Sequence, residues 1–168
     1  MSIILVLGEN DSGKSLYAEQ LSVESGSPRY YLATMMPHTD ENFKRIEKHR
    51  RQRSEKGFET LEVPWEIDQI QVERDGVVLL EDISNLLANG IFSYGADGKQ
   101  ALDKVKKLAD QCKTLIIVSI SGLTDQGYEE GTVRYINDLN WINQQLSEMA
   151  DTVYHMVDGV PIKERSVK

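Results

Sequence analysis

The chain has a single cysteine, Cys112, and no apolar run near the length of about 18 residues that a membrane-spanning helix needs. One cysteine excludes an internal disulfide and a cysteine-based metal site, so we expect Cys112 as a partly buried apolar residue at a helix end. Positive charge is also scarce, with 19 Lys and Arg against 27 Asp and Glu. The net charge of −8 disfavours non-specific binding to nucleic acids and membrane surfaces.

The N-terminal apolar residues 1–7 lead into a glycine-rich loop instead of a cleavage site, so we expect a cytoplasmic protein. Forty per cent apolar and 27% charged residues are typical of a folded globular protein. The sequence has no internal repeat and no low-complexity linker. We therefore expect one domain over residues 1–168.

Strand-like and helix-like patterns alternate along the chain, which predicts an α/β fold with a largely parallel sheet flanked by helices. The strands are expected at residues 2–7, 30–33, 58–63, 77–80 and 114–119. The helices are expected at residues 13–24, 39–55, 84–92, 99–111 and 133–149. Residues 152–157 and 160–163 flank Asp158-Gly159, which predicts a C-terminal β-hairpin.

Residues 8–15 read Gly-Glu-Asn-Asp-Ser-Gly-Lys-Ser, directly after the apolar residues 3–7. This is the G-x-x-x-x-G-K-S phosphate-binding P-loop between a strand and a helix, and it predicts a P-loop NTPase-like fold. Lys14 can reach the β- and γ-phosphates of a nucleoside triphosphate, and the Ser15 hydroxyl can ligate Mg²⁺. The residues expected to bind nucleotide here are Gly8, Glu9, Asn10, Asp11, Ser12, Gly13, Lys14 and Ser15.

Residues 77–82, Val-Val-Leu-Leu-Glu-Asp, have the form of a Walker B element, a buried strand that ends in carboxylates. Such a carboxylate helps to hold Mg²⁺ during phosphoryl transfer, and we expect Glu81 to be catalytic and a metal ligand. Glu81 and Asp82 would point to opposite sides of a continuing strand, so one of the two serves. The alternative is a solvated acidic pair that caps the strand.

Basic residues gather between positions 44 and 53 of this acidic chain. On a helix Arg45, His49 and Arg53 share one face. Guanidinium groups bind phosphate and a neutral imidazole can attack phosphorus, so this face suits a triphosphate. The alternative, more common for charged runs, is a solvent-exposed helix whose bases pair with Glu41 and Glu47. His38 and His155 lack such neighbours and are expected to be structural.

Several further motifs occur in a fixed order along the chain. They are Tyr31-Leu32-Ala33-Thr34, Asp40-Glu41, Arg45-Ile46, His49, Arg53, Thr60, Glu62, Leu79-Leu80-Glu81, Asn143-Gln144, Ala150-Asp151 and Gly159. With the P-loop, they resemble the bifunctional adenosylcobinamide kinase / adenosylcobinamide-phosphate guanylyltransferase family of cobalamin biosynthesis. The resemblance covers nearly the whole chain.

The resemblance implies two reactions on a corrinoid substrate. A nucleoside triphosphate, ATP or GTP, phosphorylates the hydroxyl of the aminopropanol arm of adenosylcobinamide. GTP then donates GMP to that phosphate through a guanylylated histidine, which corresponds to His49. The resemblance also implies catalytic roles for Lys14 and Glu81, nucleotide contacts from Arg45, Arg53 and Glu62, bound Mg²⁺, and a homo-oligomer, commonly a trimer.

The chain departs from the family pattern at positions that would lie near the acceptor or the triphosphate. Asp11 replaces an arginine in the P-loop, Ile120 a glutamate, Ile136 an arginine and Asn137 an aspartate. Two alternatives follow from these departures. The chain could be a P-loop small-molecule kinase with another acceptor, or a diverged protein that binds nucleotide without turnover.

Overall fold

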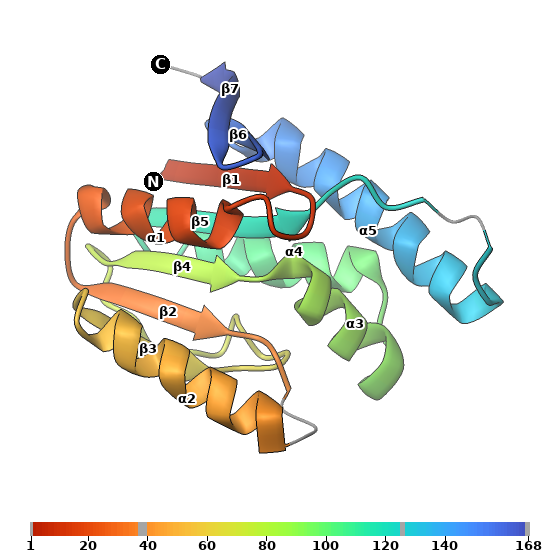
Figure 1. The fold of residues 1–168 in the computed structure, drawn as a ribbon, viewed down its shortest axis with the longest axis horizontal. Helices are drawn as coiled ribbons and strands as arrows, with labels where there is room; N and C mark the ends of the chain where they lie inside the picture. Colours follow the sequence, from red (N-terminus) through yellow and green to blue (C-terminus); the bar gives the residue numbers. More distant parts are fainter. Residues whose placement is uncertain (1, 37–39, 125–126, 167–168) are drawn as a thin grey trace.

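The computed structural model describes residues 2–36, 40–124 and 127–166 and contains a seven-stranded sheet flanked by helices on both faces (Figure 1). The strands are β1 (Ser2–Gly8), β2 (Arg29–Ala33), β3 (Phe58–Glu62), β4 (Val77–Glu81), β5 (Thr114–Ile120), β6 (Thr152–Val157) and β7 (Val160–Ser166). The helices are α1 (Lys14–Ser25), α2 (Asp40–Ser54), α3 (Ile83–Ser93), α4 (Gly98–Ala109) and α5 (Glu130–Met149).

The strand order is β3-β2-β4-β5-β1-β6-β7, and every neighbouring pair is parallel except β6 and β7. The predicted α/β fold with a largely parallel sheet and a C-terminal hairpin is therefore confirmed. Asp158 and Gly159 both have positive φ angles, 48° and 81°, as the two-residue turn of a hairpin requires. The strand β3 lies at the edge of the sheet.

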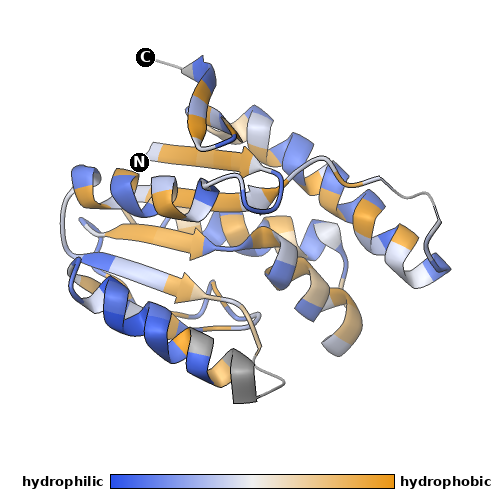
Figure 2. Ribbon diagram, in the orientation of Figure 1, coloured by the Kyte–Doolittle hydropathy of each residue, from blue (hydrophilic) through white to orange (hydrophobic). Residues whose placement is uncertain are grey.

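The central strands are buried on both faces because their sequences are almost continuously aliphatic (Figure 2). One face forms a large core with α3, α4 and α5, centred on side chains such as Leu80, Ile117 and Leu139. The opposite face packs against α1 through a smaller core that contains Val6, Ala18 and Val118. The helix α2 also lies on this second side (Figure 1).

Helices leave the sheet on opposite sides at the carboxyl ends of its central strands. The helix α1 follows β1 on one face, whereas α3 and α5 follow β4 and β5 on the other (Figure 1). Loops that diverge in this way leave a crevice at the strand ends, which is where ligands bind in open α/β sheets. The P-loop and Glu81 lie at this edge.

The predicted elements are all present, with bounds that differ by at most three residues. The helix α5 begins at Glu130, three residues before the predicted start, and β7 continues to Ser166 along its partner β6. Residues 38 and 39, with the predicted structural His38, lie outside the described residues. Across the described ranges, no helix is both long enough and apolar enough to cross a membrane.

Candidate functional site

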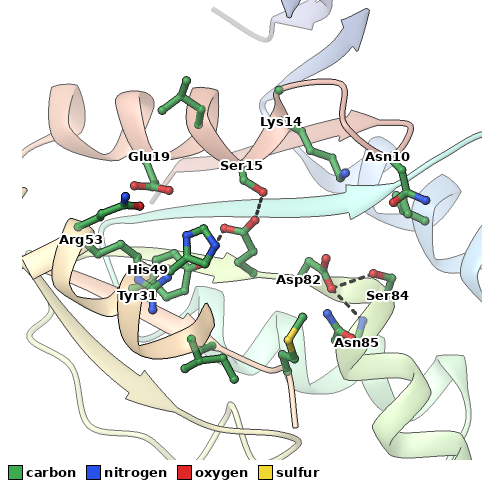
Figure 3. A pocket seen from close by; sticks show the side chains of 18 of the residues that line it. Asn10, Lys14, Ser15, Glu19, Tyr31, His49, Arg53, Asp82, Ser84 and Asn85 are labelled. Carbon is green, nitrogen blue, oxygen red and sulfur yellow. Dashed lines mark hydrogen bonds between the residues drawn. The ribbon is translucent and has the colours of Figure 1, made fainter. Parts of the chain in front are cut away.

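A cavity of about 1040 Å³ opens at the carboxyl edge of the sheet, between the P-loop, α2 and the end of β4 (Figure 3). It brings together Asn10, Asp11, Ser12, Gly13, Lys14, Ser15, His49, Arg53, Glu62 and Glu81 from the predicted site residues. Gly8 and Glu9 are not among the lining residues, and the Arg45 side chain lies outside the described part of the structure.

The P-loop takes its shape from glycines at two positions. Gly13 has a φ of 88° immediately before α1, a conformation that L side chains rarely adopt. A Cβ on Gly8 would collide with Ser12 Oγ, so a side chain at this position would force the loop to rearrange. Side chains do not cap the N-terminus of α1, which leaves its first N–H groups available to phosphate oxygens.

Lys14 is buried in the first turn of α1, and its Nζ donates to the carbonyl oxygen of Glu9 at 3.2 Å. This contact folds the ammonium group back over the loop and places it on the cavity wall. A buried cation at this point favours a bound anion, since the attraction between charges grows as water is excluded. The backbone carbonyl of Glu9 therefore holds the Lys14 ammonium group, although the Glu9 side chain does not line the cavity.

Glu81 lines the cavity at the end of β4 and accepts hydrogen bonds on both carboxylate oxygens. Ser15 Oγ donates to Oε1, and the Tyr31 hydroxyl donates to Oε2 at 2.7 Å. Burial raises the pKa of Glu81 and the two hydrogen bonds lower it, with a net increase. Burial also raises the pKa of Tyr31 well above its usual value, so Tyr31 remains a hydrogen-bond donor.

The adjacent Ser15 hydroxyl and Glu81 carboxylate fit the donor set that P-loop proteins offer to Mg²⁺. Clusters of three or more His, Cys, Asp or Glu side chains that could hold a metal are absent from the described ranges. A P-loop site does not require such a cluster, because Mg²⁺ retains water and takes further ligands from the phosphates.

Asp82 has a different role from Glu81. Its Oδ1 accepts from the backbone N–H of Asn85 and from Ser84 Oγ, both at 2.8 Å, and so caps the N-terminus of α3. Thr34 Oγ1 accepts from the Asp82 N–H at 2.9 Å and fixes the backbone where β4 ends. One carboxylate of the acidic pair contacts the P-loop and the other begins a helix.

The helix α2 presents different side chains to the cavity and to solvent. His49 and Arg53, one turn apart, line the cavity, while Arg51 forms an exposed ion pair with Glu47 at 2.9 Å. Arg53 is only 6% exposed, and its guanidinium carbon lies 3.7 Å from the centroid of the Tyr31 ring. The exposed charged helix and the cavity-facing helix are thus two sides of one element.

Other predicted residues take more peripheral positions. Glu62 lines the cavity and lies 3.7 Å from Arg50, with both side chains about half exposed. His155 lies on β6, where its Nδ1 is 3.0 Å from Glu164 Oε1. Of the departures from the family pattern, Asp11 and Ile120 line the cavity, whereas Ile136 is buried in α5. Asn137 is exposed on α5.

Several polar residues that line the cavity were not expected from the sequence, among them Tyr31, Glu19 and Asn85. Tyr31 belongs to a quoted motif, but nothing in the motif gives it a role. The signal lies in the parallel register, which pairs Tyr31 with Leu79 and Ala33 with Glu81. A long side chain two residues before the end of β2 can therefore reach the carboxylate that ends β4.

Comparisons with known proteins identify the family of the chain. Residues 4–163 match the family described as cobinamide kinase / cobinamide phosphate guanyltransferase. The bifunctional adenosylcobalamin biosynthesis protein CobU of Escherichia coli (strain K12) is 31% identical, with 96% of this chain and 98% of that protein covered. The corresponding protein CobP of Pseudomonas aeruginosa is 28% identical, with 94% of each covered.

A solved structure of a DnaB-like replicative helicase with primase aligns with a TM-score of 0.51 at 10% identity. The alignment covers 92% of this chain but only 46% of the helicase chain, so it shows the fold alone. This fold is the predicted P-loop NTPase-like one. The match of the family over nearly the whole chain goes further: the chain belongs to the cobinamide kinase / cobinamide phosphate guanyltransferase family.

Proposed function

We propose that this one cavity performs both activities of the family. In the first, the hydroxyl of the aminopropanol arm of adenosylcobinamide receives the γ-phosphoryl group of ATP or GTP. In the second, GMP passes from GTP to that phosphate and adenosylcobinamide-GDP forms. The observation that carries the proposal is that the P-loop, Glu81 and His49 line the same cavity.

In the kinase step, the acceptor oxygen attacks the γ-phosphorus and the bond from phosphorus to the β–γ bridging oxygen breaks. The buried Lys14 and the uncapped N–H groups of α1 would offset the charge on the phosphates. Ser15 and Glu81 would hold Mg²⁺, which supplies further charge neutralisation when bound.

In the transferase step, an imidazole nitrogen of His49 attacks the α-phosphorus of GTP and pyrophosphate leaves. A phosphate oxygen of the acceptor then attacks the phosphorus, and the P–N bond breaks to regenerate the histidine. Arg53, one turn along α2, would bind the nucleotide phosphates, with Arg45 and Glu62 as further nucleotide contacts. A covalent intermediate divides one transfer between two anions into two easier reactions.

The proposal includes two statements about the whole chain. Residues 1–168 would form one nucleotide-binding domain, since a single sheet contains strands from both ends of the sequence. The chain would also assemble into a homo-oligomer, a trimer by resemblance to the family.

The test is incubation of the protein with Mg²⁺ and GTP labelled at the α-phosphate, followed by denaturing electrophoresis. We expect an acid-labile, alkali-stable label on the protein that falls to background in His49→Ala. His155→Ala is the matched control, because His155 lies on β6 and does not line the cavity; its label should be unchanged. Bound GTP without any label, or a label that persists in His49→Ala, would contradict the transferase step.

A further inference from the structure

A continuous series of side-chain contacts runs beneath the cavity from the helix that carries His49 to the P-loop (Figure 3). Arg53 of α2 lies on the ring of Tyr31, the Tyr31 hydroxyl donates to Glu81, and Glu81 accepts from Ser15. These residues belong to four different elements, α2, β2, β4 and α1. The path joins the two ends of the site through side chains alone.

Tyr31 links Arg53, a proposed nucleotide-binding side chain, to Glu81, a proposed metal ligand. It is 7% exposed, and the Phe58 ring packs edge-on against it at 6.0 Å, so its ring has little freedom. Because Ser15 occupies one oxygen of Glu81 and Tyr31 the other, the two hydrogen bonds together fix the rotation of the carboxylate.

Arg53 has an unusual environment for a cation. It is 6% exposed, and its Nε has no hydrogen-bond partner within the described residues. Its defined contact is the face of the Tyr31 ring, 3.7 Å from the guanidinium carbon. The ring quadrupole attracts a desolvated cation on its face, so this contact helps to set where the last turns of α2 lie.

We propose that Tyr31 is a positioning residue with two separate contacts. Its hydroxyl orients the Glu81 carboxylate toward Ser15, and its ring, through Arg53, sets the position of the His49 helix relative to the P-loop. The second contact rests on the proposed role of His49, whereas the first does not. The two are separable because Phe at this position removes the hydroxyl and retains the ring, while Leu removes both.

The hydroxyl is tested by calorimetric titration of GTP with Mg²⁺ and, separately, with excess chelator. Tyr31→Phe should reduce the gain in GTP affinity that Mg²⁺ provides by roughly tenfold, the effect of one hydrogen bond to a charged group, and leave metal-free binding unchanged. A residue with only a structural role would change both titrations or neither.

Tyr30→Phe is the matched control for this experiment. Tyr30 is the preceding residue of β2, is equally buried at 7%, and its hydroxyl accepts from the Glu73 N–H at 3.2 Å, away from the cavity. It should leave both titrations as in the unsubstituted protein. Equal Mg²⁺-dependent gains in Tyr31→Phe and Tyr30→Phe would overturn the role of the hydroxyl.

The ring is tested by the initial rate of His49 labelling at saturating Mg²⁺ and GTP. The rate in Tyr31→Leu, which lacks the ring, should be at least tenfold lower than the rate in Tyr31→Phe, which keeps it. Tyr31→Met also removes the ring, with an unbranched and more adaptable side chain, and replaces Tyr31→Leu if thermal unfolding shows that variant to be unfolded. Equal rates in the Phe and Leu variants would overturn the role of the ring.

Failure of the proposed function gives a different pattern. If the unsubstituted protein binds GTP but is never labelled, the transferase step and the ring contact are both rejected, and the calorimetric comparison of Tyr31→Phe with Tyr30→Phe still decides the hydroxyl contact. If the unsubstituted protein is labelled and the variants do not differ, the proposed function stands and the positioning role is rejected.

Discussion

The reactivity of the Cys112 thiol is controlled by its burial. It follows α4, is 6% exposed, and its Sγ lies 3.7 Å from the carbonyl oxygen of Leu108. Burial raises the pKa of its thiol to about 11, because a thiolate would lose its hydration there. The expected apolar role at a helix end thus has a chemical consequence, since only the thiolate is a strong nucleophile.

We predict that Cys112 in the native protein reacts slowly with an aromatic disulfide reagent at pH 8 and rapidly once the chain unfolds in denaturant. The control is an exposed cysteine, Ser93→Cys at the end of α3, in a Cys112→Ala background. Its reaction should be fast in the native protein as well. Equal native rates for the two thiols would contradict the predicted effect of burial.

The helices α3 and α4 begin at capping residues, and packing against neighbouring side chains limits which residues a helix can contain. Asp82 caps α3, and Asp97 with Gln100 forms a capping box at the start of α4. Both acidic residues are visible in the sequence just before apolar helical patterns. Packing is less visible: Gly90 in α3 lies against the Trp65 ring, where a Cβ would approach to 2.5 Å.

Gly90→Ala should therefore destabilise the protein by about 1–3 kcal/mol, since overpacking of the core outweighs the better helix propensity of alanine. Gly131→Ala in α5 is the matched control, because the nearest atom to its Cβ would be Phe92 at an ordinary 3.9 Å. It should be neutral or slightly stabilising. Urea unfolding measures both, and a similar change in the two variants would contradict the prediction.

At the scale of the whole molecule, the nucleotide site joins segments that are far apart in the sequence, namely the P-loop, α2 and the end of β4. A ligand that binds only this folded arrangement stabilises all of it. At about a hundredfold excess over its Kd, such a ligand adds about 2.7 kcal/mol to the free energy of unfolding. For a chain of this length that corresponds to a rise in Tm of about 5–10 °C.

We predict this rise with Mg²⁺ and GTP, measured by differential scanning fluorimetry, and its loss in Lys14→Ala. Lys99→Ala is the matched control, because Lys99 is an exposed lysine in the first turn of α4 and lies outside the cavity. That variant should show the full rise. A rise of normal size in Lys14→Ala would contradict the placement of the phosphates on the P-loop.

The amino-acid sequence alone predicts the secondary-structure elements and the chemistry that each carries. Apolar runs of four or more residues predicted the buried strands, Asp-Gly predicted the hairpin, and the order Gly13-Lys14-Ser15 predicted the phosphate loop. These signals are local, because they depend on periodicity, on special φ angles and on side chains within one or two turns. The predicted start of α5 and the predicted end of β7 were less accurate, because strand pairing and packing set these bounds.

Which of these elements come into contact depends on the tertiary structure. The parallel register of β2 and β4 brings Tyr31 to Glu81, and the position of α2 brings Arg53 to Tyr31. The tertiary structure also shows that Glu81 contacts Ser15 of the P-loop whereas Asp82 caps α3. The sequence had left open which of the two carboxylates faces the P-loop. Such contacts join residues that are tens of positions apart, and they depend on strand order and crossover, which no local pattern contains.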